Sequence, residues 1–227
     1  MTVVLVVAGI VVLYVLLNVL TFVLPRTFVK KRQAAKNAER ERFAAEAGWR
    51  FDASVPELTT RYPVPPFTEH GDRRVAFGVL SGVQEGVPFT AFDFRMRTGV
   101  RTGLLWSEET EVHTVFALRL PVPIPPLRLF AVASQKFADQ PAPRTADPEF
   151  NKRYLIEDGD PAVVNRLFTP AATRLMVEND IGNLSVRGGE LVCTASKVFA
   201  KTSAREIAER VRVLAMVVHA ITRGGQR

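Results

Sequence analysis

The sequence has few of the residues that cross-link chains, hold metals or attack substrates. Among 227 residues there is one cysteine, Cys193, so an intramolecular disulfide is excluded. Its apolar neighbours predict a small buried side chain rather than a nucleophile. The three histidines, His70, His113 and His219, stand apart from one another and from carboxylate pairs, unlike the ligands of a metal site. We therefore expect no metal.

Loops that bind phosphate or carry a catalytic serine are also missing. Gly78, Gly82 and Gly86 are spaced by four, but neither a Gly-Lys-Ser or Gly-Lys-Thr step nor a helix pattern follows them. Ser81 lies one position too late for a nucleophile elbow, and the residues after it alternate like a strand. We expect no cofactor and assign no catalytic residue.

Excess positive charge does not mark a nucleic-acid interface in this chain. The net charge is +7, but much of it lies in the basic stretch 26–42, and acidic and basic residues are nearly balanced after it. A nucleic-acid-binding domain concentrates Lys and Arg along one folded face. No nucleic-acid partner is expected.

The most pronounced feature that is present is an uncharged apolar run from Thr2 to Leu24. As a helix, this run would be roughly 34 Å long, against about 30 Å for the hydrocarbon core of a bilayer. Pro25 closes it, and no positively charged segment precedes it, unlike a cleaved signal peptide. Residues 1–25 are therefore predicted to be an uncleaved transmembrane anchor.

The charges beside the anchor set its predicted orientation. Lys30, Lys31, Arg32 and Lys36 all follow the apolar run, and no basic residue precedes it. The positive-inside rule then places the N-terminus outside and the domain in the cytoplasm of a single-pass plasma-membrane protein. The same four cations are candidates for contact with anionic lipid headgroups or with a partner, and the alternative is a topology signal on a solvated spacer.

Two further features concern the anchor and the helix after it. Residues 26–48 are rich in Ala, Lys, Arg, Glu and Gln, which predicts a juxtamembrane helix ended by Gly48. Asn18 is the candidate for a helix–helix contact and hence for a homo-oligomer, because an amide in hydrocarbon gains from a partner across a helix pair. The alternative is that Asn18 lies near the headgroup layer.

Residues 49–227 are predicted to form one α+β domain. Apolar residues alternate with polar ones over 73–83, 87–97 and 110–120, which indicates strands, with a turn at 84–86. The chain then supplies two short helices, a hairpin and a final amphipathic helix, without βαβ alternation. We expect a largely antiparallel sheet of about seven strands packed by the C-terminal helix, similar in outline to a pleckstrin-homology-like roll.

Capping residues mark the helix starts in the second half of the domain. Asp160 and Thr169 each precede a proline, so each joins an N-cap side chain to a proline at the first helical position. Ser203 with Glu206 three residues later is a capping box, which predicts the start of the last helix.

Charged and titratable residues on the strands are the remaining candidates for a site. Alternation brings Asp93, Arg95 and Arg97 to one face, which is a candidate for contact with an anionic lipid head or an acidic partner. The alternative is an ordinary solvated sheet face. His113 shares a strand face with Glu111, so it is a candidate general base, and the alternative is a histidine on the surface or rim of the domain.

Short motifs across nearly the whole chain suggest a resemblance. They are Gly48-Trp49-Arg50-Phe51, Arg61-Tyr62-Pro63, Ala91-Phe92-Asp93-Phe94, Leu120-Pro121 through Pro126-Leu127, Asp147-Pro148-Glu149-Phe150-Asn151-Lys152-Arg153-Tyr154 and Leu167-Phe168-Thr169-Pro170-Ala171. Together with the N-terminal anchor, they resemble uncharacterised actinobacterial single-span membrane proteins of about this length. The resemblance implies an anchor followed by a domain, and it implies no activity, cofactor or site residue.

The sequence thus predicts a membrane-tethered cytoplasmic domain that acts by binding a protein or a lipid headgroup and not by catalysis. Two alternatives stay open. One is an enzyme of unrecognised type, with a site around His70, Asp93 or His113. The other is a structural oligomer assembled through the anchor helix.

Overall fold

The computed structural model describes residues 24–102, 105–131, 143–196 and 202–225. Asn18 and the predicted anchor up to residue 23 lie outside these ranges. Within the described ranges, no helix combines the length and the apolar character needed to cross a bilayer. The chain divides into two compact units, residues 1–39 and 40–227, so the second unit begins within the predicted juxtamembrane helix.

Helix α2, Leu24–Ala47, contributes to both units. It ends as the sequence predicts, because Gly48 has a φ of 69°, a left-handed conformation that costs glycine nothing. The backbone N–H of Trp49 donates to the carbonyl of Ala44 at 2.7 Å, and that of Gly48 donates to the carbonyl of Ala45. These two bonds satisfy carbonyls at the helix end and turn the chain into the first strand.

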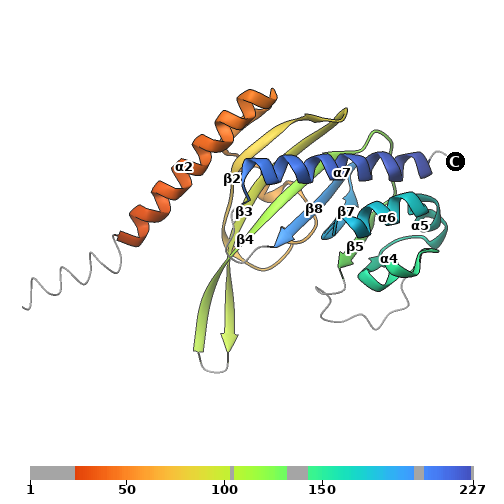
Figure 1. Ribbon diagram of the computed structural model, residues 1–227. Coiled ribbons are helices and arrows are strands. Elements are labelled where there is room, and N and C mark those ends of the chain that lie inside the picture. The colour runs from red at the N-terminus through yellow and green to blue at the C-terminus, as the bar shows by residue number, and fades with distance from the viewer. Residues whose placement is uncertain (1–23, 103–104, 132–142, 197–201, 226–227) are drawn as a thin grey trace, which may run out of the picture. The chain divides into compact units, whose positions relative to one another are not determined.

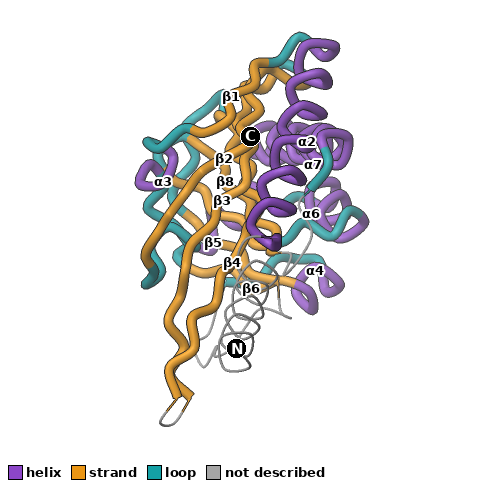
Figure 2. Tube along the Cα trace, turned by 90° about the vertical axis from the view of Figure 1, so that its left-hand side faces the viewer, coloured by secondary structure: helices purple, strands orange, loops and turns teal. Residues whose placement is uncertain are grey.

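The second unit is built on one antiparallel sheet of eight strands (Figures 1 and 2). The strands are β1 Arg50–Ser54, β2 Asp72–Gln84, β3 Val87–Thr102, β4 Leu105–Arg119, β5 Leu127–Ala131, β6 Tyr154–Glu157, β7 Asn183–Arg187 and β8 Glu190–Ser196. Their order is β1-β2-β3-β4-β8-β7-β5-β6. The late hairpin β7–β8 is thus inserted between β4 and β5, two strands that are consecutive in sequence.

The α+β class and the antiparallel sheet are as predicted, but two details differ. The sheet has eight strands where about seven were expected. In the described residues, β1 and β6 are edge strands that do not pair with each other, so the described sheet does not close into the predicted roll. The reason is the insertion of β7–β8, which widens the sheet instead of bringing its edges together.

The helices of the second half lie on one side of this sheet, while α3, Leu58–Arg61, lies on the other (Figure 2). Those helices are α4 Pro148–Arg153, α5 Pro161–Leu167, α6 Pro170–Glu178 and α7 Ala204–Gly225. The predicted caps are present: Asp160 and Thr169 accept bonds from backbone N–H groups of α5 and α6. The reciprocal bonds between Ser203 and Glu206 form the capping box of α7.

Two hydrophobic clusters cover the two faces of the sheet. The larger cluster packs the apolar stripe of α7, including Ile207, Val211 and Leu214, against the helix-covered face. The smaller cluster is aromatic and lies under α3, where Tyr62 and Phe67 pack on Phe92 and its neighbours. Burial of each such large side chain contributes about 1.5–3 kcal/mol, so both faces stabilise the sheet.

Aromatic side chains pack the end of α2 against the β2–β3 hairpin. The Trp49 ring lies between Phe43 of α2 and Phe89 of β3, with centroid separations of 5.6 and 4.7 Å. Gly82 of β2 makes room for this ring, because a Cβ there would come within 2.6 Å of Trp49 Cδ1. Small size at position 82 is therefore a packing requirement.

Replacing Gly82 with alanine should lower the free energy of unfolding by about 1–3 kcal/mol, since the Trp49 ring must move out of a filled space. Urea unfolding of the full chain in mild detergent measures this cost. In a Trp49→Leu background the ring is gone, so the added cost of G82A should fall to below about 0.5 kcal/mol. Equal costs in both backgrounds would contradict the proposed clash.

Candidate functional site

A buried cluster of polar side chains joins α2 to the sheet and to the start of α7. Its centre is Arg40, on the last turns of α2, whose side chain is 2% exposed. Arg40 Nη2 lies 2.9 Å from Asp93 Oδ2 on β3 and donates to the carbonyl of Thr202 at 2.7 Å. Arg40 Nη1 donates to the carbonyl of Gly78 on β2 at 2.7 Å. One guanidinium therefore links four segments that are far apart in sequence.

The carboxylate in this cluster is held from its other side by one threonine hydroxyl, which a second threonine hydroxyl contacts in turn. Thr114 Oγ1 on β4 donates to Asp93 Oδ1 at 3.0 Å, and it lies 2.7 Å from Thr202 Oγ1. Asp93, Thr114 and Thr202 are all buried. We call Arg40, Asp93, Thr114, Thr202 and the Gly78 carbonyl the Arg40 cluster.

The cluster corrects the prediction that Asp93 lies on an exposed charged face. Asp93 is 1% exposed, because the end of α2 and Thr202 cover it. Strand alternation identified the face on which Asp93 lies, but it carried no information about the segment that packs over that face. Arg40 was the missed residue, and the only signal was an arginine in a helix already rich in cations.

The conformation and the small size of Gly78 fit the Arg40 cluster. Its φ is 62°, and it lies where the β2–β3 register shifts between Phe77 and Leu80. A Cβ at this position would collide with Arg40 Nη1. The irregularity in β2 thus turns a carbonyl toward Arg40 and leaves room for the guanidinium.

A buried ion pair contributes little net stability, although breaking it is costly. The free-energy cost of taking two charges out of water offsets most of their mutual attraction. Mutating one partner alone leaves the other charge buried and uncompensated. Arg40 Nε is buried without a hydrogen-bond partner among the described residues, which adds a further cost. The Arg40 cluster therefore fixes which face of the α2 end packs on the sheet.

The other two residues of the predicted charged face differ from Asp93. Arg95 is exposed, with its guanidinium 5.8 Å from the centroid of the Phe77 ring. Arg97 forms a bidentate ion pair with Asp72, at 2.8 Å for Nε–Oδ1 and 2.6 Å for Nη2–Oδ2. Hydrogen bonding to Arg97 lowers the pKa of Asp72. The three residues share a face, but only Arg95 presents its side chain openly to solvent.

The predicted basic contact residues lie on α2. The side chains of Lys30, Lys31 and Arg32 are outside the described part of the structure, and Lys36 is half-buried. Their contact with lipid or a partner stays a prediction, as does the helix–helix contact of Asn18.

The residues named for a catalytic alternative do not converge. His113 Nε2 lies 3.2 Å from Glu111 Oε2, as their shared strand face predicted. However, His113 is paired with Phe94 and Thr114 with Asp93, so His113 and Asp93 point to opposite faces of the sheet. His70 is exposed in the loop before β2. Among the described residues, no group of three or more His, Cys, Asp and Glu side chains could hold a metal ion.

Cys193 on β8 is buried, and burial raises the pKa of its thiol to about 12. A thiol with so high a pKa is almost entirely protonated near neutral pH, and the protonated form is a poor nucleophile. Cys193 is therefore a core residue, as its apolar surroundings predicted.

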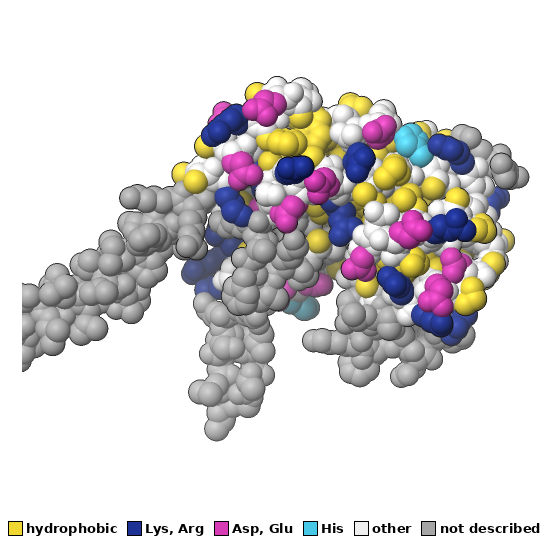
Figure 3. Space-filling view, viewed as in Figure 1, with side chains coloured by type: hydrophobic (Ala, Val, Ile, Leu, Met, Phe, Trp, Pro, Cys, Tyr) yellow, Lys and Arg dark blue, Asp and Glu magenta, His cyan; other side chains and the backbone are white. Residues whose placement is uncertain are grey.

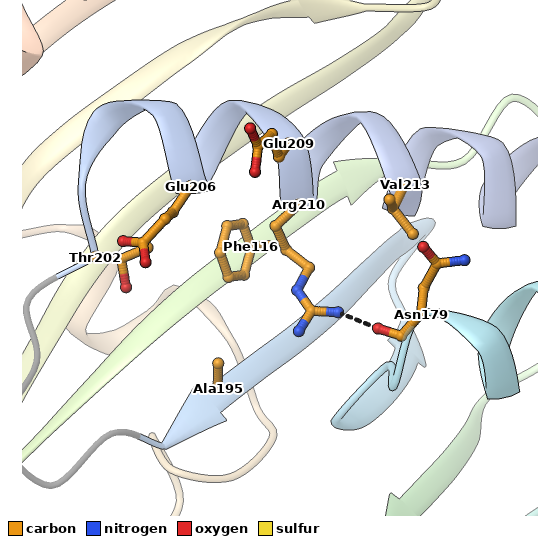
Figure 4. A pocket seen from close by; sticks show the side chains of 8 residues that line it. All are labelled: Phe116, Asn179, Ala195, Thr202, Glu206, Glu209, Arg210 and Val213. Atoms are coloured by element: carbon orange, nitrogen blue, oxygen red, sulfur yellow. Dashed lines mark hydrogen bonds between the residues drawn. The ribbon is translucent and has the colours of Figure 1, made fainter.

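A pocket of about 280 Å³ lies beside the Arg40 cluster and shares Thr202 with it (Figure 4). Its walls come from β4, β8, the end of α6 and the first half of α7. On the surrounding face, acidic and basic side chains are interspersed with apolar ones (Figure 3). Because its residues come from four separate elements, no sequence motif pointed to this pocket.

No protein-family model matches the sequence, and no curated protein matches it significantly. A likeness is found among solved structures, to the crystal structure of the mycobacterial trehalose monomycolate transport factor A, TtfA. The alignment covers 82% of this chain and 95% of that chain, with a TM-score of 0.55 and 12% sequence identity. At this identity, the likeness establishes a related fold.

Asp93→Asn should lower the free energy of unfolding by about 3–5 kcal/mol, because Arg40 would stay buried without a counter-charge. Arg40→Met with Asp93→Leu should recover most of that loss, since neither charge then remains. Urea unfolding followed by Trp49 fluorescence measures both. Asp72→Asn, which breaks the exposed pair with Arg97, is the matched control and should cost less than about 1 kcal/mol. A D93N variant as stable as the control would refute this account.

Cys193 should react with iodoacetamide at pH 8 far more slowly in the folded chain than in urea. With a thiol pKa of about 12, the thiolate fraction at pH 8 is about one in ten thousand, and the fraction rises tenfold per pH unit up to the pKa. Mass spectrometry of the alkylated chain gives both rates. Equal rates would show that the thiol is accessible.

Proposed function

We propose that this protein is a non-enzymatic factor in lipid handling, tethered to the membrane and acting at its inner surface. The observation that carries the proposal is that one helix, α2, bears the cations Lys30, Lys31, Arg32 and Lys36 as well as Arg40, the buried centre of the domain's polar cluster. The helix that follows the predicted anchor is thus also a part of the domain's core.

The fold likeness supports the same role. The similar structure is named as a transport factor for trehalose monomycolate, and 95% of its chain is covered. We carry over to this chain the broader part of that name, participation in the movement of a lipid. The class of lipid and the partner proteins are not carried over.

Electrostatics makes the basic part of α2 suitable for an anionic leaflet. Each Lys or Arg close to such a surface contributes about 1 kcal/mol of binding free energy. Four cations in seven positions, next to an apolar run long enough to span a bilayer, would hold anionic headgroups around the helix. A cytoplasmic location of the domain follows from the same charges and belongs to the proposal.

Catalysis is less well supported than binding. Asp93 is held by Arg40 and Thr114, and it lies on the sheet face opposite His113. Cys193 is buried and protonated at neutral pH. Asp93 and His113 lie on opposite faces of the sheet and Cys193 is buried, so binding accounts better for the arrangement.

The proposal predicts selective retention of anionic lipid. Full-length protein reconstituted into nanodiscs of phosphatidylcholine with a minor fraction of phosphatidylglycerol should enrich the anionic lipid, as seen by native mass spectrometry after release. Changing Lys30, Lys31, Arg32 and Lys36 to Gln should reduce this enrichment at least about tenfold, given about 1 kcal/mol per cation.

A control variant should change the net charge equally at other positions. Arg144, Arg166, Arg174 and Arg212 are exposed, and changing all four to Gln should leave the enrichment unchanged. If both variants lose the same amount of lipid, the effect is one of overall charge and the proposed contact is wrong. Unchanged enrichment in the variant that changes Lys30, Lys31, Arg32 and Lys36 to Gln would also contradict the proposal.

A further inference from the structure

The pocket beside the Arg40 cluster has an apolar floor and a polar wall. Phe116 of β4 and Ala195 of β8 form the floor, and Arg210 projects from α7 above them (Figure 4). Asn179, at the end of α6, lies across from Arg210. Small-molecule sites typically combine such an apolar surface with a few placed polar groups. At about 280 Å³, the pocket is suited to a small ligand.

The polar wall keeps hydrogen-bonding capacity that the fold itself does not use. Arg210 Nη1 donates to the carbonyls of Asn179 and Asp180, at 3.0 and 3.3 Å. Its Nε and Nη2 have no partner among the described residues. Asn179 Nδ2 donates to the carbonyl of Leu175, which leaves Oδ1 as an unused acceptor in the described structure. Glu209 adds a carboxylate that is 63% exposed.

Charges of both signs line the pocket, which argues against an ionic ligand. Glu206 accepts bonds from the N–H and hydroxyl of Ser203, and Glu209 lies 3.4 Å from Arg205. Of the described lining residues, Glu206 and Glu209 are acidic and Arg210 is basic, while Arg205 lies outside the pocket. An anion would be repelled by the two glutamates and a cation by Arg210. A neutral ligand that offers both donors and acceptors fits better.

We propose that this pocket binds an uncharged sugar ring. Each sugar hydroxyl is a donor and an acceptor, so neighbouring hydroxyls can accept from Arg210 and donate to Glu209 or Asn179. The C–H groups on one face of the ring would lie over Ala195 and the small part of Phe116, 2% of its surface, that is exposed. Thr202 in the wall is held through the Arg40 cluster, so this part of the site is formed before the ligand arrives.

The proposal is independent of the anionic-lipid contact on α2, because it uses none of Lys30, Lys31, Arg32 or Lys36. Failure of one therefore leaves the other standing. The sugar could belong to a free saccharide or to the headgroup of a glycolipid. Both sources present the same hydroxyl chemistry, and they are separated by whether an attached alkyl chain strengthens binding.

The test is titration of the full chain, purified in lauryldimethylamine oxide, because detergents with sugar headgroups would occupy the site. Maltose should give saturable saturation-transfer NMR signals with a dissociation constant in the millimolar range. Glu209→Ala and Arg210→Leu should each weaken binding at least about fivefold, since each removes a hydrogen bond to a charged group. Arg212→Leu, on the same helix but outside the pocket, should leave binding unchanged.

Further variants and ligands complete the test. Val213→Trp fills the pocket and should abolish maltose binding, while the slow alkylation of Cys193 verifies that each variant is folded. Hexyl β-maltoside below its critical micelle concentration should bind more tightly than maltose if the source is a glycolipid, and equally if it is a free sugar. Absence of saturable maltose binding up to about 50 mM, or binding of inorganic phosphate in its place, would overturn the proposal.

Discussion

The structure depends on one buried ion pair, between Arg40 and Asp93. Through it, the end of α2 is joined to β3, while the same guanidinium binds the carbonyls of Gly78 and Thr202. A charge taken out of water needs its counter-charge and its hydrogen bonds together, because a missing partner costs several kcal/mol. The position of α2's last turns, the irregularity in β2 and the start of α7 are therefore set by the same requirement.

Much of the fold was predictable because its signals are local. Alternation in β2, β3 and β4, the proline-linked caps of α5 and α6, and the capping box of α7 each depend on residues a few positions apart. The antiparallel α+β class follows from their order. The total of eight strands and the open sheet were not predictable, because the placement of β7–β8 between β4 and β5 is a long-range pairing with no local mark.

The candidate site was less accessible to sequence reasoning for the same reason. Asp93 was assigned to the right strand but to solvent, because its partner Arg40 lies 53 positions away within a run of charged residues. The pocket residues Phe116, Asn179, Ala195 and Arg210 come from four elements that meet only in the folded chain. Periodicity identifies the face on which a residue lies, and it does not identify the segment that covers that face.

The choice of arginine at position 40 also determines the register of α2. A shift by one helical turn would bring Lys36 to Asp93, and a shift by one residue would bring Glu39 or Glu41. An ammonium group is a compact point charge, whereas the planar guanidinium has a fixed fork of donors that reaches Gly78, Asp93 and Thr202 together. A glutamate would place two carboxylates side by side in a buried site. Arg40 satisfies all three acceptors, so the ion pair favours one docking register for the end of α2.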